Sequence, residues 1–163
     1  MAEQQITYSS DKATAYRQLA EEVAAVVAGE TSRTARHATT VSLLKAAFGE
    51  RFFWCGFYEV DPLKSEELVV GPYQGSLGCL RIPFGKGVCG AAASKRTTII
   101  VPDVHKFPGH IACDSRSNSE IVVPVFDAKG ALVSVLDVDS TDFEAFDDVD
   151  ARGLESVCRA MMR

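Results

Sequence analysis

The chain has 163 residues, a formal net charge of −5 and 47% hydrophobic residues. That length fits one domain with a substantial hydrophobic core, so we expect a single domain over residues 1–163. The acidic balance and the lack of a local Lys/Arg cluster argue against binding to nucleic acid or an anionic membrane. No signal peptide is expected, and no apolar run approaches the roughly 20 residues that cross a bilayer. These features favour a soluble, cytoplasmic protein.

Two helices are expected at the N-terminal end. Residues 11–28 carry an apolar stripe with helical spacing, and Asp11 or one of the serines before it can cap this helix. Residues 31–48 carry a second stripe that stops at Gly49. Together these segments predict a helical hairpin.

Strands dominate the rest of the chain. Residues 52–60 are aromatic and nearly continuously apolar, which is typical of a buried strand, and residues 67–74 should be its antiparallel partner. The other expected elements are a strand at 80–83, a helix at 87–95, an extended segment at 97–101, an irregular loop at 102–118, a hairpin of residues 119–125 and 131–139, and a last helix from the Asp147 cap to about residue 162. This order predicts an α/β (α+β) fold, in which the helical hairpin and the last helix pack on a mostly antiparallel sheet.

Three of the five cysteines lie outside apolar periodic segments, and they are Cys79, Cys89 and Cys113. A permanent disulfide framework is not expected in a reducing compartment. Partly exposed thiols with a lowered pKa are reactive, and three of them can provide an attacking thiolate and a resolving partner. We therefore interpret the three as redox-active, and Cys55 and Cys158 as buried structural thiols.

Two other sites in the same region are weaker hypotheses. Zinc could have ligands in sufficient number, namely Cys79, Cys89, His105, His110 and Cys113. No Cys-x-x-Cys pair anchors them, so no metal is expected. Residues 85–90 match the dinucleotide-binding glycine pattern, but the neighbouring strands look antiparallel and no acid follows at the required spacing, so no cofactor is expected.

Three acids should converge at one end of the sheet. Strand geometry puts Asp137 and Asp139 on one face, roughly 6.5–7 Å apart, and Glu120 opens the preceding strand at the same end. Solvated strand ends are the alternative interpretation. Grouped carboxylates can bind an ammonium group, and their repulsion and burial can keep one of them protonated at neutral pH.

Two aromatic residues complete the candidate site. Trp54 and Tyr58 are four residues apart on one strand, so they point to the same side. They form either part of the core or the wall of an apolar pocket. His37, on the second helix, is expected at the surface.

Taken together, these residues resemble the free methionine-(R)-sulfoxide reductases, a family of GAF-domain enzymes. The resemblance extends over nearly the whole chain, and its motifs are residues 54–58, 71–75, 79, 84–90, 101–104, 108–114, 119–124 and 136–140. It implies a GAF fold around a small pocket, reduction of the free amino acid rather than of protein-bound residues, and regeneration by a thioredoxin-type protein.

The resemblance also assigns roles. Cys113 would be the attacking thiol, and Cys79 or Cys89 would form a disulfide with it. Glu120, Asp137 and Asp139 would bind the amino group and the sulfoxide oxygen, and Trp54 and Tyr58 would hold the methyl group. A GAF module that binds a small ligand or senses redox state without catalysis is the alternative function. Homodimerisation through the N-terminal helices is a further hypothesis.

Overall fold

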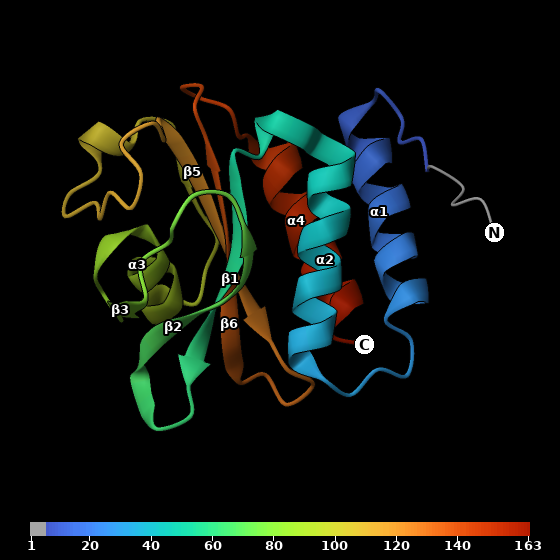
Figure 1. Ribbon diagram of the computed structural model, residues 1–163, viewed down its shortest axis with the longest axis horizontal. Coiled ribbons are helices and arrows are strands. Elements are labelled where there is room, and N and C mark those ends of the chain that lie inside the picture. Colours follow the sequence, from blue (N-terminus) through green and yellow to red (C-terminus); the bar gives the residue numbers. More distant parts are fainter. Residues whose placement is uncertain (1–5) are drawn as a thin grey trace.

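A six-stranded antiparallel sheet separates two layers of helices in the computed structural model, which describes residues 6–163 (Figure 1). The strands are β1 (Trp54–Asp61), β2 (Lys64–Gln74), β3 (Arg81–Pro83), β4 (Ile99–Val101), β5 (Ser119–Phe126) and β6 (Leu132–Ser140), in the spatial order β3-β2-β1-β6-β5-β4. The helices are α1 (Lys12–Val26), α2 (Arg33–Phe48), α3 (Gly87–Lys95) and α4 (Asp148–Met161), with 3₁₀ turns η1 (Gly49–Arg51) and η2 (Val104–Lys106). The expected fold class is confirmed.

Residues 1–5 lie outside the described part of the chain. The structure therefore does not test the expectation that the chain has no signal peptide. The first five positions of the expected domain also lie outside the described residues. Within residues 6–163, none of the helices combines the length and the apolar character needed to span a membrane.

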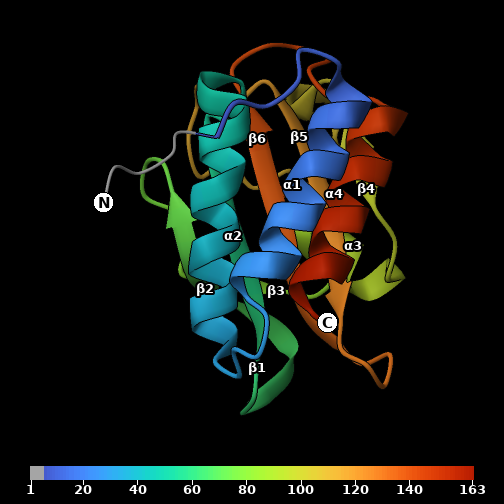
Figure 2. The same cartoon turned by 90° about the vertical axis from the view of Figure 1, so that its right-hand side faces the viewer.

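The two faces of the sheet carry different covers. Helices α1, α2 and α4 lie side by side over one face, and α3 lies over the other (Figures 1 and 2). Strand alternation divides the side chains of β1 between them: Cys55 and Phe57 belong to the core under the three long helices, whereas Trp54 and Tyr58 belong to the cluster under α3. The sheet therefore has one structural face and one face that is available for a site.

The helix ends follow the sequence signals. The side chain of Asp11 accepts a hydrogen bond from the backbone N–H of Thr14 at 2.9 Å and caps α1. Gly49 ends α2 with a φ of 55°, a conformation that costs glycine little. Asp147 and Asp150 form a reciprocal capping box at the start of α4. These three expected boundaries are confirmed.

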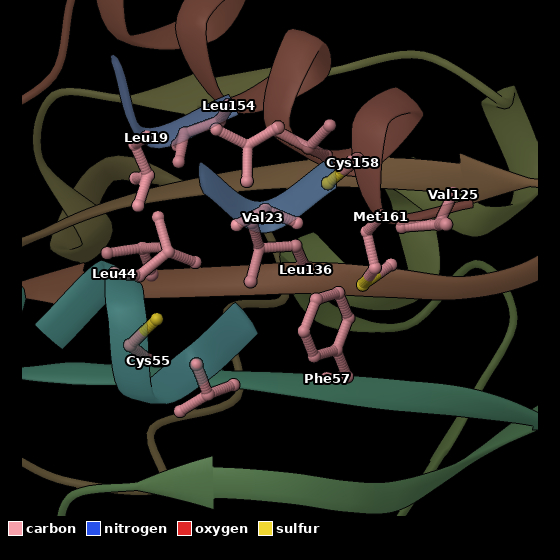
Figure 3. Close-up of a cluster of buried hydrophobic side chains, with 14 of the residues drawn as sticks. Leu19, Val23, Leu44, Cys55, Phe57, Val125, Leu136, Leu154, Cys158 and Met161 are labelled. Carbon is pink, nitrogen blue, oxygen red and sulfur yellow. The ribbon is translucent and has the colours of Figure 1, made fainter. Parts of the chain in front are cut away.

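The larger core lies between the three long helices and the sheet (Figure 3). Figure 3 labels Leu19, Val23, Leu44, Cys55, Phe57, Val125, Leu136, Leu154, Cys158 and Met161 in it. The thiols of Cys55 and Cys158 are free and buried there, as expected. Burial raises the pKa of Cys158 to about 12, so this thiol is unreactive.

His37 is not at the surface, which corrects the expectation. The side chain is fully buried and stacks on Phe57 with ring centroids 4.1 Å apart. Its Nδ1 lies 2.7 Å from the Oε1 of Glu59, so the ring keeps a polar partner inside the protein. His37, Val41 and Leu44 are spaced so that they share one face of α2, which puts the imidazole on the apolar stripe. The expected surface position followed from the polar residue type and ignored this spacing.

Several strand boundaries also differ from the expectation, and the starts of β1 and β2 have a clear cause. Strand β1 begins at Trp54 rather than at residue 52, because η1 occupies residues 49–51 and Phe52 donates its backbone N–H to the carbonyl of Gly49. Strand β2 begins at Lys64 rather than at residue 67, because the turn after Asp61 closes within two residues. In both cases hydrogen bonding in a turn sets the boundary.

Gly153 of α4 lies directly against Tyr16 of α1, and this contact yields a stability prediction. A Cβ atom at this position would lie 2.2 Å from Cγ of Tyr16, whose hydroxyl is fixed by donating to Asp150. Gly153→Ala should therefore lower the free energy of unfolding by about 2 kcal/mol despite the higher helix propensity of alanine. Urea denaturation measures this loss. The exposed neighbour Arg152→Ala should stay within about 0.5 kcal/mol of the wild type, and equal stability of the Gly153→Ala protein would contradict the packing described here.

Candidate active site

A small cavity lies on the α3 face of the sheet. Seven of the eight predicted site residues line it, namely Trp54, Tyr58, Cys89, Cys113, Glu120, Asp137 and Asp139. The eighth, Cys79, is joined to Cys113 by a disulfide. Strands β1, β5 and β6, helix α3 and the loop before β5 each contribute side chains, so residues far apart in sequence are brought together at one place.

Sheet register brings the three carboxylates together. Glu120 of β5 is the direct partner of Asp139 of β6. Asp137 precedes Asp139 by two residues on β6 and lies on the same face of the sheet. Across the other edge of β6, Trp54 is paired with Asp139 and Gly56 with Asp137. The acids therefore lie beside the aromatic residues of β1, as the alternation predicted.

Glu120 and Asp137 are only 5% and 6% exposed, and Asp139 is half-buried. Burial raises the pKa of each well above its ordinary value. The charge of Asp139 adds to the pKa shift of Glu120, and the charge of Glu120 adds to that of Asp137. These shifts favour the protonated form of the group, which can donate protons or exchange them for a cation.

The cysteines differ in environment. Cys113 is exposed and Cys79 is half-buried, and their Cα atoms are 5.8 Å apart across the disulfide. Cys89 lies in the first turn of α3 with a free, buried thiol, whose pKa is raised by burial and by the charge of Asp137. Sequence spacing left open whether Cys79 or Cys89 partners Cys113; the structure pairs Cys113 with Cys79.

The aromatic residues form one wall of the cavity. Trp54 stacks on Tyr58 and on Tyr73 with ring centroids 5.6 and 5.1 Å away. The indole N–H donates to the backbone carbonyl of Ser76 at 2.9 Å, which fixes the ring. Gly78 lies against this wall, where a Cβ would be 2.9 Å from the Tyr58 hydroxyl. The wall is rigid and apolar on its cavity side.

The loop that carries Cys113 contributes a residue that the sequence analysis did not place in the site. Nε2 of His110 lies 3.3 Å from Oε2 of Glu120, and burial lowers the pKa of the imidazole, so it is neutral at pH 7. Asp114 and Arg116 form an ion pair at 2.7 Å within the loop. The guanidinium of Arg116 also lies 4.8 Å from the ring centroid of Phe53 and anchors the loop to the start of β1.

The cavity is small in this disulfide-bonded state. Its volume is about 30 Å³, which has room for a water, or for a small ion with a water, but not for an amino acid the size of methionine. Ile111 of the loop lies against Gly87, the first residue of α3, because a Cβ added to Gly87 would be 3.2 Å from Cγ1 of Ile111. The loop therefore lies directly on α3. A substrate of amino-acid size therefore needs this loop to move.

Comparison with known proteins identifies the fold family. The family model described as "GAF domain" matches residues 30–162, which is most of the chain. The chain belongs to the GAF domain family. This GAF domain is 42% identical over 161 residues to GAF domain-containing protein A of Dictyostelium discoideum, with 99% of each chain covered.

Its close relatives include free methionine-R-sulfoxide reductases. This GAF domain is 45% identical over 142 residues to the free methionine-R-sulfoxide reductase of Escherichia coli, which covers 87% of this chain and 83% of that protein. The crystal structure of the free methionine-R-sulfoxide reductase of Neisseria meningitidis in complex with its substrate superposes with a TM-score of 0.89 at 48% identity, covering 96% of this chain and 92% of that chain.

The carboxyl cluster gives this GAF domain a predictable pH dependence. Because the folded-state pKa values are raised, the folded protein holds protons that the unfolded chain releases above about pH 4. This contribution to the free energy of unfolding is complete below that pH and is lost as pH rises through the folded pKa values. Asp137→Asn removes one such proton. The free energy of unfolding of the variant should therefore fall less steeply with rising pH than that of the wild type, and the two slopes should differ by up to about 1.4 kcal/mol per pH unit. Urea denaturation between about pH 5 and 8 tests this, and parallel slopes for the two proteins would contradict it.

Proposed function

We propose that this protein reduces free L-methionine-(R)-sulfoxide to methionine. The observation that carries the proposal is the position of Cys113: an accessible cysteine that lines the same cavity as the buried Glu120 and Asp137 and the half-buried Asp139. The named activity of the Escherichia coli and Neisseria meningitidis relatives supports the same substrate and the same epimer.

The carboxyl cluster suits both ends of this substrate. A carboxylate can pair with the ammonium group of a free amino acid, whereas a peptide-bonded nitrogen has no charge to offer. A carboxylic acid that stays protonated at neutral pH can donate its proton to the sulfoxide oxygen, which makes that oxygen a better leaving group. Glu120 and Asp137 have the raised pKa values that this role needs. The wall of Trp54 and Tyr58 offers an apolar surface for the S-methyl group.

The reaction balances with two thiols. The Cys113 thiolate attacks the sulfoxide sulfur, the oxygen is transferred to Cys113, and methionine leaves while Cys113 becomes a sulfenic acid. The Cys79 thiol then attacks the Cys113 sulfur and water departs, which leaves the disulfide present in this structure. Two electrons have passed from the thiols to the substrate, and an external dithiol of the thioredoxin type returns them.

Exposed leucines near the disulfide suit a protein reductant. Leu77 and Leu80 flank Cys79 and are 84% and 76% exposed. Leu80→Asp should lower kcat/KM for a thioredoxin by about tenfold, since it places a charge where the two proteins would meet, while turnover with dithiothreitol stays unchanged. Leu63→Asp, in the β1–β2 turn and 91% exposed, is the matched control and should affect neither reaction. Equal thioredoxin kinetics for the Leu80→Asp variant and the wild type would remove this surface from the proposal.

The substrate proposal is tested by comparing three compounds under reducing conditions. With dithiothreitol present, the protein should consume free methionine-(R)-sulfoxide and leave both the S epimer and N-acetylmethionine-(R)-sulfoxide unchanged. Chromatography of the amino acid products measures this. No consumption of the R epimer would favour the non-catalytic GAF module, and equal consumption of the N-acetyl compound would exclude ammonium recognition.

A further inference from the structure

Three buried side chains form a compact donor cluster at the floor of the cavity. The sulfur of Cys89 and one carboxylate oxygen each of Glu120 and Asp137 all lie within 4.8 Å of one another. They come from α3, β5 and β6, so no local spacing reveals them. No Cys-x-x-Cys pair marks this cluster in the sequence, because it is assembled only by the fold.

A second observation points to a ligand at this place. Oδ1 of Asp137 is buried and has no hydrogen-bond partner, although the carboxyl group lines the cavity. A buried acceptor without a partner is energetically costly, so such groups usually face a bound water or ion.

The size of the space selects a small occupant. The volume of about 30 Å³ holds an ion together with a water. At zinc–ligand distances of about 2.0–2.3 Å, tetrahedral ligand atoms lie about 3.5 Å apart. The three donor atoms, within 4.8 Å of one another, are close to that spacing. His110, whose Nε2 is 3.3 Å from Oε2 of Glu120, lines the same cavity beside the cluster.

We propose that Cys89, Glu120 and Asp137 bind one Zn²⁺ ion in the oxidised protein, with a water as the fourth ligand. Thiolate and carboxylate are both zinc ligands, whereas Mg²⁺ and Ca²⁺ avoid thiolate and Cu⁺ avoids carboxylate. Three anionic ligands offset the ionic charge of +2 inside the protein. The ligands bind deprotonated, so zinc displaces their protons to solvent. Because two of the ligands are carboxylates of the proposed substrate site, bound zinc would exclude the substrate, a consequence that rests on the proposed function.

The test uses oxidised protein, in which the disulfide removes Cys79 and Cys113 as competing zinc ligands. Calorimetric titration with Zn²⁺ should give one site per chain, and Co²⁺ should give the near-ultraviolet charge-transfer band of a thiolate ligand. Cys89→Ser and Asp137→Asn should each weaken zinc binding by more than about 100-fold, since each removes a direct ligand, and Cys89→Ser should also abolish the band. Cys158→Ser changes a free buried thiol under the opposite face and should bind zinc like the wild type.

Several results would overturn the proposal. These are absence of saturable zinc binding to the wild type, wild-type affinity in the Cys89→Ser variant, or equal loss in Cys158→Ser. Circular dichroism checks that each variant is folded, and the Asp137→Asn protein provides an independent reading if Cys89→Ser fails to fold. No substrate is present in these titrations, so failure to bind zinc leaves the reductase proposal standing. Failure of the reductase assay likewise leaves the zinc result standing.

Discussion

Replacement of Cys113 by serine should abolish reduction of free methionine-(R)-sulfoxide, lowering kcat/KM by at least about 10⁴-fold. A serine hydroxyl stays protonated at neutral pH and cannot accept the oxygen to form a sulfenic acid. The exposed position of Cys113 at the cavity rim gives this sulfur access both to the substrate and to solvent. Steady-state assays with dithiothreitol measure the loss.

Two other cysteine variants make this result specific. Cys158→Ser, which alters a buried thiol in the helix-covered core, should retain wild-type turnover. Cys79→Ser should release one methionine per chain and keep a sulfenic acid on Cys113 that reacts with dimedone, because the partner that resolves it is missing. Full activity of the Cys113→Ser protein would remove this residue from the role of nucleophile.

Asp137→Asn should lower kcat/KM by about 100-fold, the second largest effect we expect. The substitution keeps the size of the side chain but removes a buried group that pairs with the substrate ammonium or protonates the sulfoxide oxygen. The same variant should be more stable than the wild type near neutral pH, because the pKa of the lost carboxyl is raised on folding. A loss of activity without a loss of stability would separate substrate binding from folding.

A matched substitution at an exposed acid controls for net charge. Asp142→Asn, just beyond the end of β6, makes the same chemical change outside the cavity and should leave kcat/KM within about twofold of the wild type. If Asp137→Asn were equally silent, the carboxyl cluster would have no part in substrate recognition.

Most of the candidate site follows from strand alternation. Trp54 and Tyr58 share a face because they are four residues apart, and Asp137 and Asp139 share one because they are two apart. Glu120 joins them because a short hairpin fixes the register of β5 on β6. Local patterns with a period of two therefore predict which side chains meet on the sheet.

The remaining features depend on contacts between distant segments. Cys79 and Cys113 are 34 residues apart, and nothing in the intervening sequence states that the loop returns to Cys79 rather than to Cys89. The burial of Cys89 results from the packing of α3 on the sheet, and His110 enters the cavity only because its loop folds over α3. The burial of His37 also depends on a distant segment, because Glu59 of β1 provides the polar partner that the buried imidazole needs.

The central claim is that Cys113 receives the sulfoxide oxygen and Cys79 resolves it. A single turnover of fully reduced protein with one equivalent of methionine-(R)-sulfoxide, quenched by alkylation and mapped by peptide mass spectrometry, tests this most directly. We expect one methionine for each Cys79–Cys113 disulfide formed, with Cys89 alkylated after unfolding in every chain. Methionine production that leaves Cys113 free for alkylation, or that links Cys113 to Cys89 instead, would contradict the account.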